Sequence, residues 1–201
     1  MPTGGGSHQP FDQRLLDAAA RLIREEGYEG LAPATAAERA GVTLEGDPPG
    51  QWDLFDAVVR GDEDRFNALV ASALAASETH GERLLAVIET CVLDYDWTYW
   101  IELWSLALRD DRARALRDEL DGAFRSQLAE VVEAGRASGE FDAADAELAA
   151  VAIATLIDAL AVEATLGDDT VSPNYMLGAC ASVAGRILGT ELRLRDRSDY
   201  G

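Results

Sequence analysis

The chain has 201 residues, a formal net charge of −20 and 17 basic residues, every one of them arginine. This length suits one ordinary domain or a small head with a larger body, and 48% hydrophobic residues is enough to bury a core. The negative charge disfavours nucleic acid as a partner, because phosphate backbones are held by several arginines or lysines.

The first part of the chain predicts a disordered start and two short helices. Residues 1–10 are rich in glycine, are expected to be disordered, and lack the basic-then-apolar pattern of a signal peptide. Residues 11–26 carry apolar side chains at helical spacing, and Gly27 is expected to end that helix. A second helix is predicted from Pro33, which suits a first helical position, to Gly41.

The stretch after Gly41 is too short for the second helix of a helix-turn-helix motif. A short helix followed by a glycine turn is typical of the first half of a helix-turn-helix motif, whose second helix enters the DNA major groove. Only the five residues 43–47 separate Val42 from Pro48-Pro49. A proline inside a helix costs ~3 kcal/mol, so at most one helical turn is predicted here. From 11 to 50, four arginines accompany eight acidic residues, which makes this region net negative by four.

The rest of the chain predicts further helices separated by polar turns. A helix is predicted from Asp53 to about residue 74, with an interruption at Gly61-Asp62, and His80-Gly81 is predicted to be a loop with His80 exposed to solvent. The run 82–109 indicates two helices or one bent helix. Three more helices are expected over 111–135, 145–166 and 173–192.

These elements predict an all-α fold without strands or repeats. The domain organisation we expect is a disordered N-terminus (1–10), a degenerate helix-turn-helix head (11–52), a helical ligand-binding and dimerisation domain (53–192) and a flexible tail (193–201). Cys91 and Cys180 are expected to be buried and reduced, and no histidine or cysteine spacing suggests a metal site. The longest apolar segment contains Asp158 and Glu163, so we expect no membrane span and a cytoplasmic protein.

Several local patterns, in this order and spacing, resemble the TetR/AcrR family of repressors. They are Leu15-Leu16-Asp17-Ala18-Ala19-Ala20-Arg21-Leu22-Ile23 with Glu26-Gly27-Tyr28-Glu29-Gly30, Ala37-Glu38-Arg39-Ala40-Gly41-Val42, Trp100-Ile101-Glu102-Leu103-Trp104 with Leu108-Arg109-Asp110, and Leu156-Ile157-Asp158-Ala159-Leu160 with Val171-Ser172-Pro173. The resemblance implies a TetR-like fold with a vestigial head and a helical ligand-binding body. It also implies a homodimer through the last two long helices, where small residues such as Gly178, Ala181 and Gly185 permit close approach.

The aromatic segment 89–104 is the best candidate for a site. Helical spacing places Glu89, Asp96 and Tyr99 near one face, and we predict that they handle protons. The expected substrate contacts are Trp97, Trp100 and Trp104 as walls, with Arg125 and Asp158 as polar groups. The alternative for these residues is ordinary core packing, and for Asp158 a structural hydrogen bond.

Two functions remain open from the sequence. The first is a protein that has lost DNA binding and uses its pocket directly, resembling the TetR-like cyclases of natural-product biosynthesis. Such an enzyme would close the ring of a large, apolar, polyketide-like molecule by acid–base chemistry, without a cofactor and with no or weak nucleic-acid contact. The alternative is a ligand-responsive transcriptional regulator of the TetR family. The shortened second helix favours the first, and the intact first helix pair favours the second.

Overall fold

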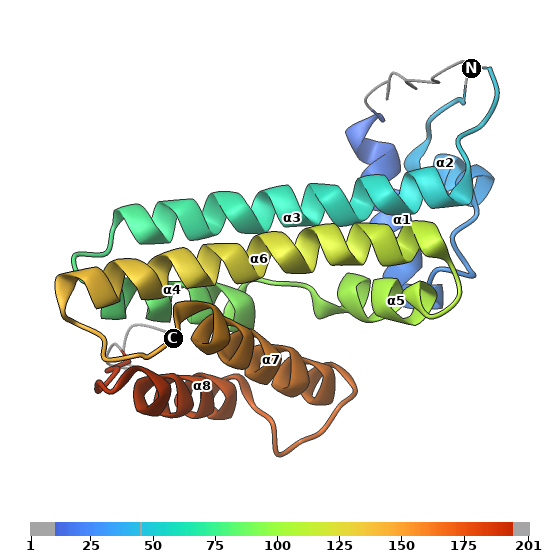
Figure 1. Ribbon diagram of the computed structural model, residues 1–201. Helices are drawn as coiled ribbons and strands as arrows, with labels where there is room; N and C mark the ends of the chain where they lie inside the picture. Colours follow the sequence, from blue (N-terminus) through green and yellow to red (C-terminus); the bar gives the residue numbers. More distant parts are fainter. Residues whose placement is uncertain (1–10, 45, 195–201) are drawn as a thin grey trace. The chain divides into compact units, whose positions relative to one another are not determined.

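The computed structural model describes residues 11–44 and 46–194, and these contain eight helices and no strand (Figure 1). The prediction of an all-α fold is confirmed. The chain divides into two compact units, with the boundary between Gly61 and Asp62. The predictions for residues 1–10, and for 195–201 of the tail, lie outside the described residues.

The first unit begins with the predicted helix pair. Helix α1 (Gln13–Glu26) starts at Asp12, whose side chain accepts a hydrogen bond from the Arg14 backbone, and it buries its apolar face. Helix α2 (Pro33–Ala40) starts with proline and ends at Gly41, which adopts the left-handed conformation (φ 62°) that glycine tolerates best. This is the helix–turn geometry that the sequence predicts.

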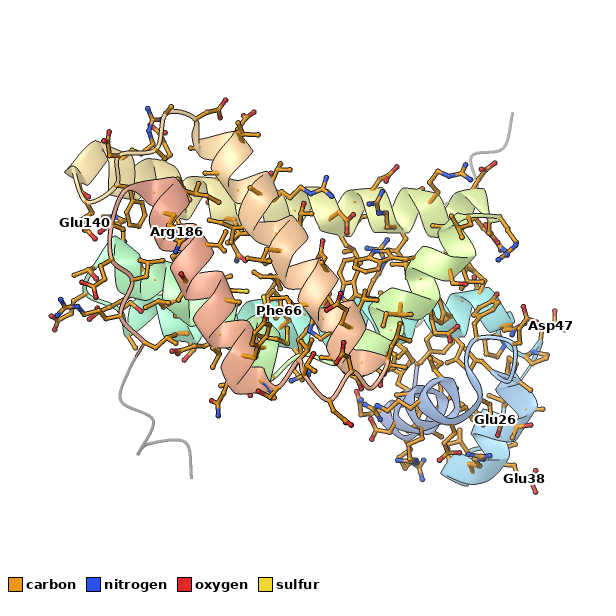
Figure 2. All side chains as sticks on the ribbon, turned by 90° about the horizontal axis from the view of Figure 1, so that it is seen from below. Glu26, Glu38, Asp47, Phe66, Glu140 and Arg186 are labelled. Atoms are coloured by element: carbon orange, nitrogen blue, oxygen red, sulfur yellow. The ribbon has the colours of Figure 1, made fainter. Side chains whose placement is uncertain are left out.

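No recognition helix follows in the described part of the segment 42–50. The sequence expectation is therefore confirmed, and its reason is the proline pair that precedes α3. Figure 2 labels Glu26, Glu38 and Asp47 among the side chains of this unit. Arg39 is paired with Glu26 at 3.0 Å, and also with Glu25, so its charge is already engaged by carboxylates.

Helix α3 (Gln51–Ala75) is one continuous helix, so the predicted interruption at Gly61-Asp62 is wrong. A glycine inside a helix costs only about 1 kcal/mol, which the flanking apolar residues can offset. A Cβ atom at Gly61 would meet nothing within 4 Å. The glycine is thus a tolerated weak point and not a break.

The second unit continues with five helices. They are α4 (His80–Leu93), α5 (Trp97–Ala107), α6 (Asp111–Ser138), α7 (Ala146–Thr165) and α8 (Pro173–Leu188). Helix α6 packs against α4, α5 and α7, and α8 packs against α4 and α7. Phe66 and Val70 of α3 lie in the same hydrophobic core, and Figure 2 shows Phe66 among these helices. Two separate helices, α4 and α5, occupy the run that predicted two helices or one bent one.

Helix α4 starts at His80, two residues before the predicted run 82–109, so the prediction of an exposed loop at His80-Gly81 is wrong. Thr79 caps the helix and forms a capping box with Glu82, so that backbone N–H groups at the start of α4 have hydrogen-bond acceptors. The Glu140 carboxylate accepts from the His80 backbone N–H at 2.8 Å and lies 2.7 Å from its ring Nδ1. These bonds lower the pKa of Glu140, with the His80 side chain as the main cause.

The turn after α6 is closed by an aromatic side chain. Phe141 is buried and packs directly over Gly135 near the end of α6, so that a Cβ atom there would lie 2.2 Å from Phe141 Cδ2. Gly122, farther along the same helix, is exposed and has nothing within 4 Å. A side chain at Gly135 would therefore clash with Phe141, whereas a side chain at Gly122 has room.

Helix α7 is, by length and composition alone, apolar enough to cross a membrane. It buries Ile153, Ile157 and Leu160 in the hydrophobic core of the second unit, and its Asp158 lines a cavity there. Core helices of soluble proteins pass the same test, so the composition of α7 is weak evidence for a membrane span.

Candidate functional site

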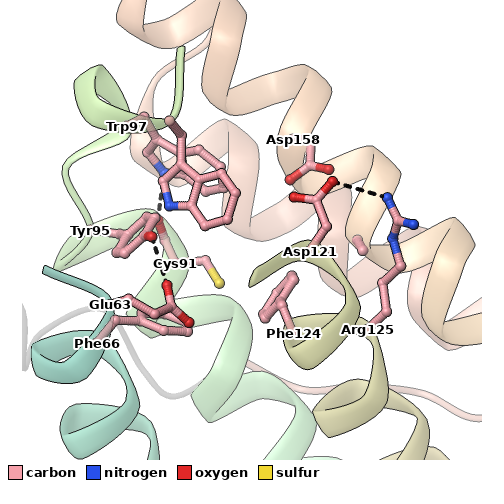
Figure 3. Close-up of a pocket in the computed structure, with 11 residues that line it drawn as sticks. Glu63, Phe66, Cys91, Tyr95, Trp97, Asp121, Phe124, Arg125 and Asp158 are labelled. Atoms are coloured by element: carbon pink, nitrogen blue, oxygen red, sulfur yellow. Dashed lines mark hydrogen bonds and ion pairs between the residues drawn. The ribbon is translucent and has the colours of Figure 1, made fainter. Parts of the chain in front are cut away.

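A narrow cavity lies inside the second unit, lined by side chains from α3 to α7 (Figure 3). Its volume is about 20 Å³, room for roughly one water molecule. The lining residues are mostly aromatic or acidic. They are Glu63, Phe66, Cys91, Tyr95, Trp97, Trp100, Asp121, Phe124, Arg125, Ala154 and Asp158.

One side of the cavity is an aromatic wall. The ring centroids of Phe66 and Tyr95 are 4.7 Å apart, and Tyr95 meets Trp97 edge-on at 5.2 Å. The Trp97 indole N–H donates to the Cys91 carbonyl at 2.9 Å, which fixes the ring orientation. Phe124 meets Phe66 at 6.0 Å from across the bundle. Aromatic faces carry negative potential, so such a wall attracts cations.

Glu63 is the carboxylate on this aromatic side. It is 7% exposed, and its hydrogen bonds come from two neutral donors, Tyr95 Oη at 3.0 Å and Asn67 Nδ2 at 3.1 Å. Burial raises the pKa of Glu63, while these two hydrogen bonds act in the opposite direction. Among the described residues no arginine pairs with it. A buried carboxylate without a cationic partner is costly, and a ligand can supply the missing charge.

The opposite side of the cavity holds a cluster of charges (Figure 3). The Asp121 carboxylate is 2.6 Å from Arg117 Nε and 3.4 Å from Arg125 Nη2. Burial raises the pKa of Asp121, and the two arginines oppose that shift. Asp158 lies beside Asp121, and burial, together with the Asp121 charge, raises its pKa to about 7.

The structure places four of the predicted site residues on the cavity. Trp97, Trp100, Arg125 and Asp158 all line it. Trp104 lies outside the lining and packs against Trp100 at 5.9 Å between ring centroids. The Nε1 atom of Trp100 is buried without a hydrogen-bond partner among the described residues.

The three residues predicted to handle protons lie elsewhere. Glu89 is half-buried in a different groove, between α3 and α4, and Asp96 caps the N-terminus of α5 by accepting from Thr98 N at 3.1 Å. Tyr99 is 2% exposed but is not among the lining residues. The prediction assumed one helical phase from Glu89 to Tyr99, but the chain leaves the helix after α4 and begins α5 only at Trp97. Helical spacing does not carry across that break.

The sequence analysis missed Glu63, Tyr95, Asp121 and Phe124. A signal for two of them was present: Glu63 is in helical phase with Phe66 and Val70, so a carboxylate stands within an apolar stripe. Asp121 is likewise in phase with Phe124 and Leu128.

The two thiols are buried as expected, and burial raises the pKa of Cys91, so this cavity-lining thiol stays neutral. No group of three His, Cys, Asp or Glu residues suited to a metal ion occurs in the described part of the chain.

Solved structures of TetR-type regulators share this all-helical fold. One is a proposed transcriptional regulator from Saccharomonospora viridis in complex with choline, with 21% identity, a TM-score of 0.77 and coverage of 85% of this chain and 93% of that one. Another is a proposed TetR-family transcriptional regulator from Rhodococcus sp., with 20% identity, a TM-score of 0.74 and coverage of 87% and 96%. A TetR transcription regulator from Haloarcula marismortui ATCC 43049 has 22% identity, a TM-score of 0.72 and coverage of 90% and 97%.

The sequence itself gives the family. Residues 80–189, more than half of the chain, match the C-terminal domain of BetI-type transcriptional repressors, and the chain belongs to this family within the TetR fold. No curated protein matches the chain.

These findings correct the functional prediction. The family match and the structural relatives are regulators, so the prediction of a polyketide cyclase that has left DNA regulation is wrong. Glu89, Asp96 and Tyr99, the residues predicted to transfer protons, do not line this cavity. The error arose because the missing recognition helix and the aromatic segment were taken as signs of an enzyme, although an aromatic cavity suits a ligand-binding regulator equally well.

Proposed function

We propose that this chain is a ligand-responsive transcriptional regulator whose effector is a small organic cation. The observation that carries the ligand class is the buried Glu63 carboxylate, which has neutral partners and stands at an aromatic wall. A cation bound there gains both the charge of Glu63 and the faces of the aromatic rings. The structural relative from Saccharomonospora viridis was crystallised with choline, a cation of this kind.

The aromatic wall suits an alkylated ammonium better than a metal ion or a primary amine. Trimethylammonium groups carry their charge on an apolar surface and donate no hydrogen bonds, so aromatic faces can replace their water at little cost. Glu63 then acts through its charge and not through a hydrogen bond, which agrees with its oxygens being occupied by Tyr95 and Asn67.

The variant Glu63→Gln should bind choline roughly tenfold to hundredfold more weakly than the wild type, because the ligand charge loses its buried counter-charge. Isothermal titration calorimetry on the purified chain measures this. The matched control is Glu89→Gln, which removes a half-buried carboxylate from the other groove and should leave choline affinity within about threefold. Equal affinity of wild type and Glu63→Gln would contradict a cationic effector at this wall.

We propose that the regulator is a cytoplasmic homodimer that pairs through α7 and α8. Large apolar side chains are exposed on these helices, including Leu148 at 66%, Tyr175 at 55% and Val183 at 39%. Such apolar exposure is typical of a protein–protein interface, and regulators of this fold commonly dimerise through their last two helices.

The DNA contact of this regulator must be made without a helix in the described part of segment 42–50. Fewer side chains then reach the bases, and the carboxylates of the first unit repel phosphate. We therefore expect binding to the DNA flanking its own gene to be detectable at about 50 mM salt and to fall by at least tenfold at about 200 mM.

Fluorescence anisotropy with labelled flanking DNA, with and without choline, tests this expectation. Choline should change the DNA affinity, and scrambled DNA of the same length is the control for sequence preference. A complete lack of binding at low salt would contradict the regulator proposal, whatever the calorimetry shows for choline.

A further inference from the structure

The two sides of the cavity differ in their charge balance. The side with Glu63 has one buried carboxyl group and no cationic partner among the described residues, whereas the opposite side has two carboxyl groups, Asp121 and Asp158, with two arginines, Arg117 and Arg125. Figure 3 shows Glu63 with Tyr95 and Phe66 on one side, and Asp158 with Asp121 and Arg125 on the other. A ligand that places its cation at Glu63 therefore presents its other end to Asp158.

The two carboxylates of the charged cluster differ in how far they are already engaged by arginines. Asp121 is held by Arg117 at 2.6 Å and by Arg125 at 3.4 Å, so it is engaged on its own helix. Asp158 accepts no hydrogen bond from any described residue, although it lines the cavity. Its oxygens are the acceptors on this side that a ligand can use.

We propose that Asp158 determines which polar group the effector carries opposite its cation: a hydrogen-bond donor such as a hydroxyl is accepted, and a carboxylate is rejected. This inference rests on the proposed function, since it concerns the same effector. An ionised Asp158 accepts a hydroxyl proton, but it repels a ligand carboxylate unless it first takes up a proton itself. Trp100 also lines the cavity, and its buried indole N–H has no hydrogen-bond partner among the described residues.

The groups that face Asp158 make this selectivity dependent on pH. From α6 these are Asp121, Arg125 and Arg117, from α4 the neutral thiol of Cys91, and from α3 Glu63 on the other wall of the cavity, whereas α5 and α8 add no charged group to the lining. With Asp158 ionised, the two aspartates and two arginines sum to zero charge, and with Asp158 protonated they sum to +1. Since the pKa of Asp158 is raised to about 7, both states are populated near neutral pH.

The experiment compares choline with trimethylammonioacetate, which has the same cationic group and a carboxylate in place of the hydroxymethyl group. Calorimetry at pH 8 should show choline bound at least about tenfold more tightly by the wild type, and this ratio should fall at pH 6. In Asp158→Asn the ratio at pH 8 should fall to within about threefold. The control Glu163→Gln removes an exposed carboxylate from the same helix and should keep the wild-type ratio.

A second readout follows the proton directly. Titrations at pH 7 in buffers of different ionisation enthalpy should show proton release when choline binds and proton uptake when trimethylammonioacetate binds, with both signals lost in Asp158→Asn. If choline binds but Asp158→Asn keeps the wild-type selectivity and proton signals, the inference is wrong while the cationic effector stands. If neither ammonium compound binds the wild type, both the inference and the proposed effector class are wrong.

Discussion

The variant Gly135→Ala should lose about 2 kcal/mol or more of its free energy of unfolding. The added methyl group would lie 2.2 Å from Cδ2 and 2.3 Å from Cε2 of Phe141, well inside van der Waals contact. Phe141 is 6% exposed and belongs to the hydrophobic core, so its ring cannot swing into solvent without exposing apolar surface. The cost of moving it exceeds the roughly 1 kcal/mol that alanine gains over glycine inside a helix.

The same helix provides the control. Gly122→Ala adds a methyl group where nothing lies within 4 Å, so it should raise the free energy of unfolding by about 0.5 to 1 kcal/mol. Urea unfolding followed by circular dichroism measures both variants. If Gly135→Ala proves as stable as Gly122→Ala, Phe141 does not pack over α6 as described.

The variant Asp158→Asn should be more stable than the wild type at pH 8, by about 2 to 4 kcal/mol. The pKa of Asp158 is raised from 3.8 to about 7, chiefly by burial, so the folded state holds a proton that the unfolded chain releases near pH 4. Between those two pKa values the stability contribution of Asp158 falls as the pH rises, and above pH 7 the full penalty remains. Asparagine carries no charge and removes the penalty.

The pH dependence separates this effect from a general change in packing. At pH 5 most of the penalty is absent in the wild type, so the difference between Asp158→Asn and wild type should shrink by more than half. Urea unfolding at both pH values tests this, with Glu163→Gln as a control that should stay within about 0.5 kcal/mol of wild type at each pH. A stability gain that is equal at pH 5 and pH 8 would contradict a raised pKa for Asp158.

The helices were predictable because their starts carry strong local signals. Asp110, Asp145 and Ser172 each cap a helix at the position where the sequence indicates one, and Pro173 occupies the first turn of α8. The proline pair before α3 is likewise a local signal, because two adjacent prolines leave no room for a full recognition helix after Val42. Such signals act within one turn of chain, so they need no knowledge of packing.

The site was only partly predictable because it depends on how helices meet. Trp97 and Asp158 stand out in the sequence as aromatic or charged residues within apolar stretches. Glu63 and Asp121 are in helical phase with apolar residues, but this signal is weak because each stands in a long helix with many other charged residues. Glu89 was misplaced because the break at residues 94–96 resets the helical phase. Capping by Asp96 is visible only once that break is known.

The small volume of the cavity has a kinetic consequence. A ligand larger than a water molecule, such as the effector proposed above, fits only after the lining side chains have rearranged. The observed affinity is then the intrinsic affinity of the open form multiplied by the fraction of molecules that are open. We therefore expect the proposed effector to enter and leave no faster than this rearrangement allows, which would lengthen the residence time of the bound state.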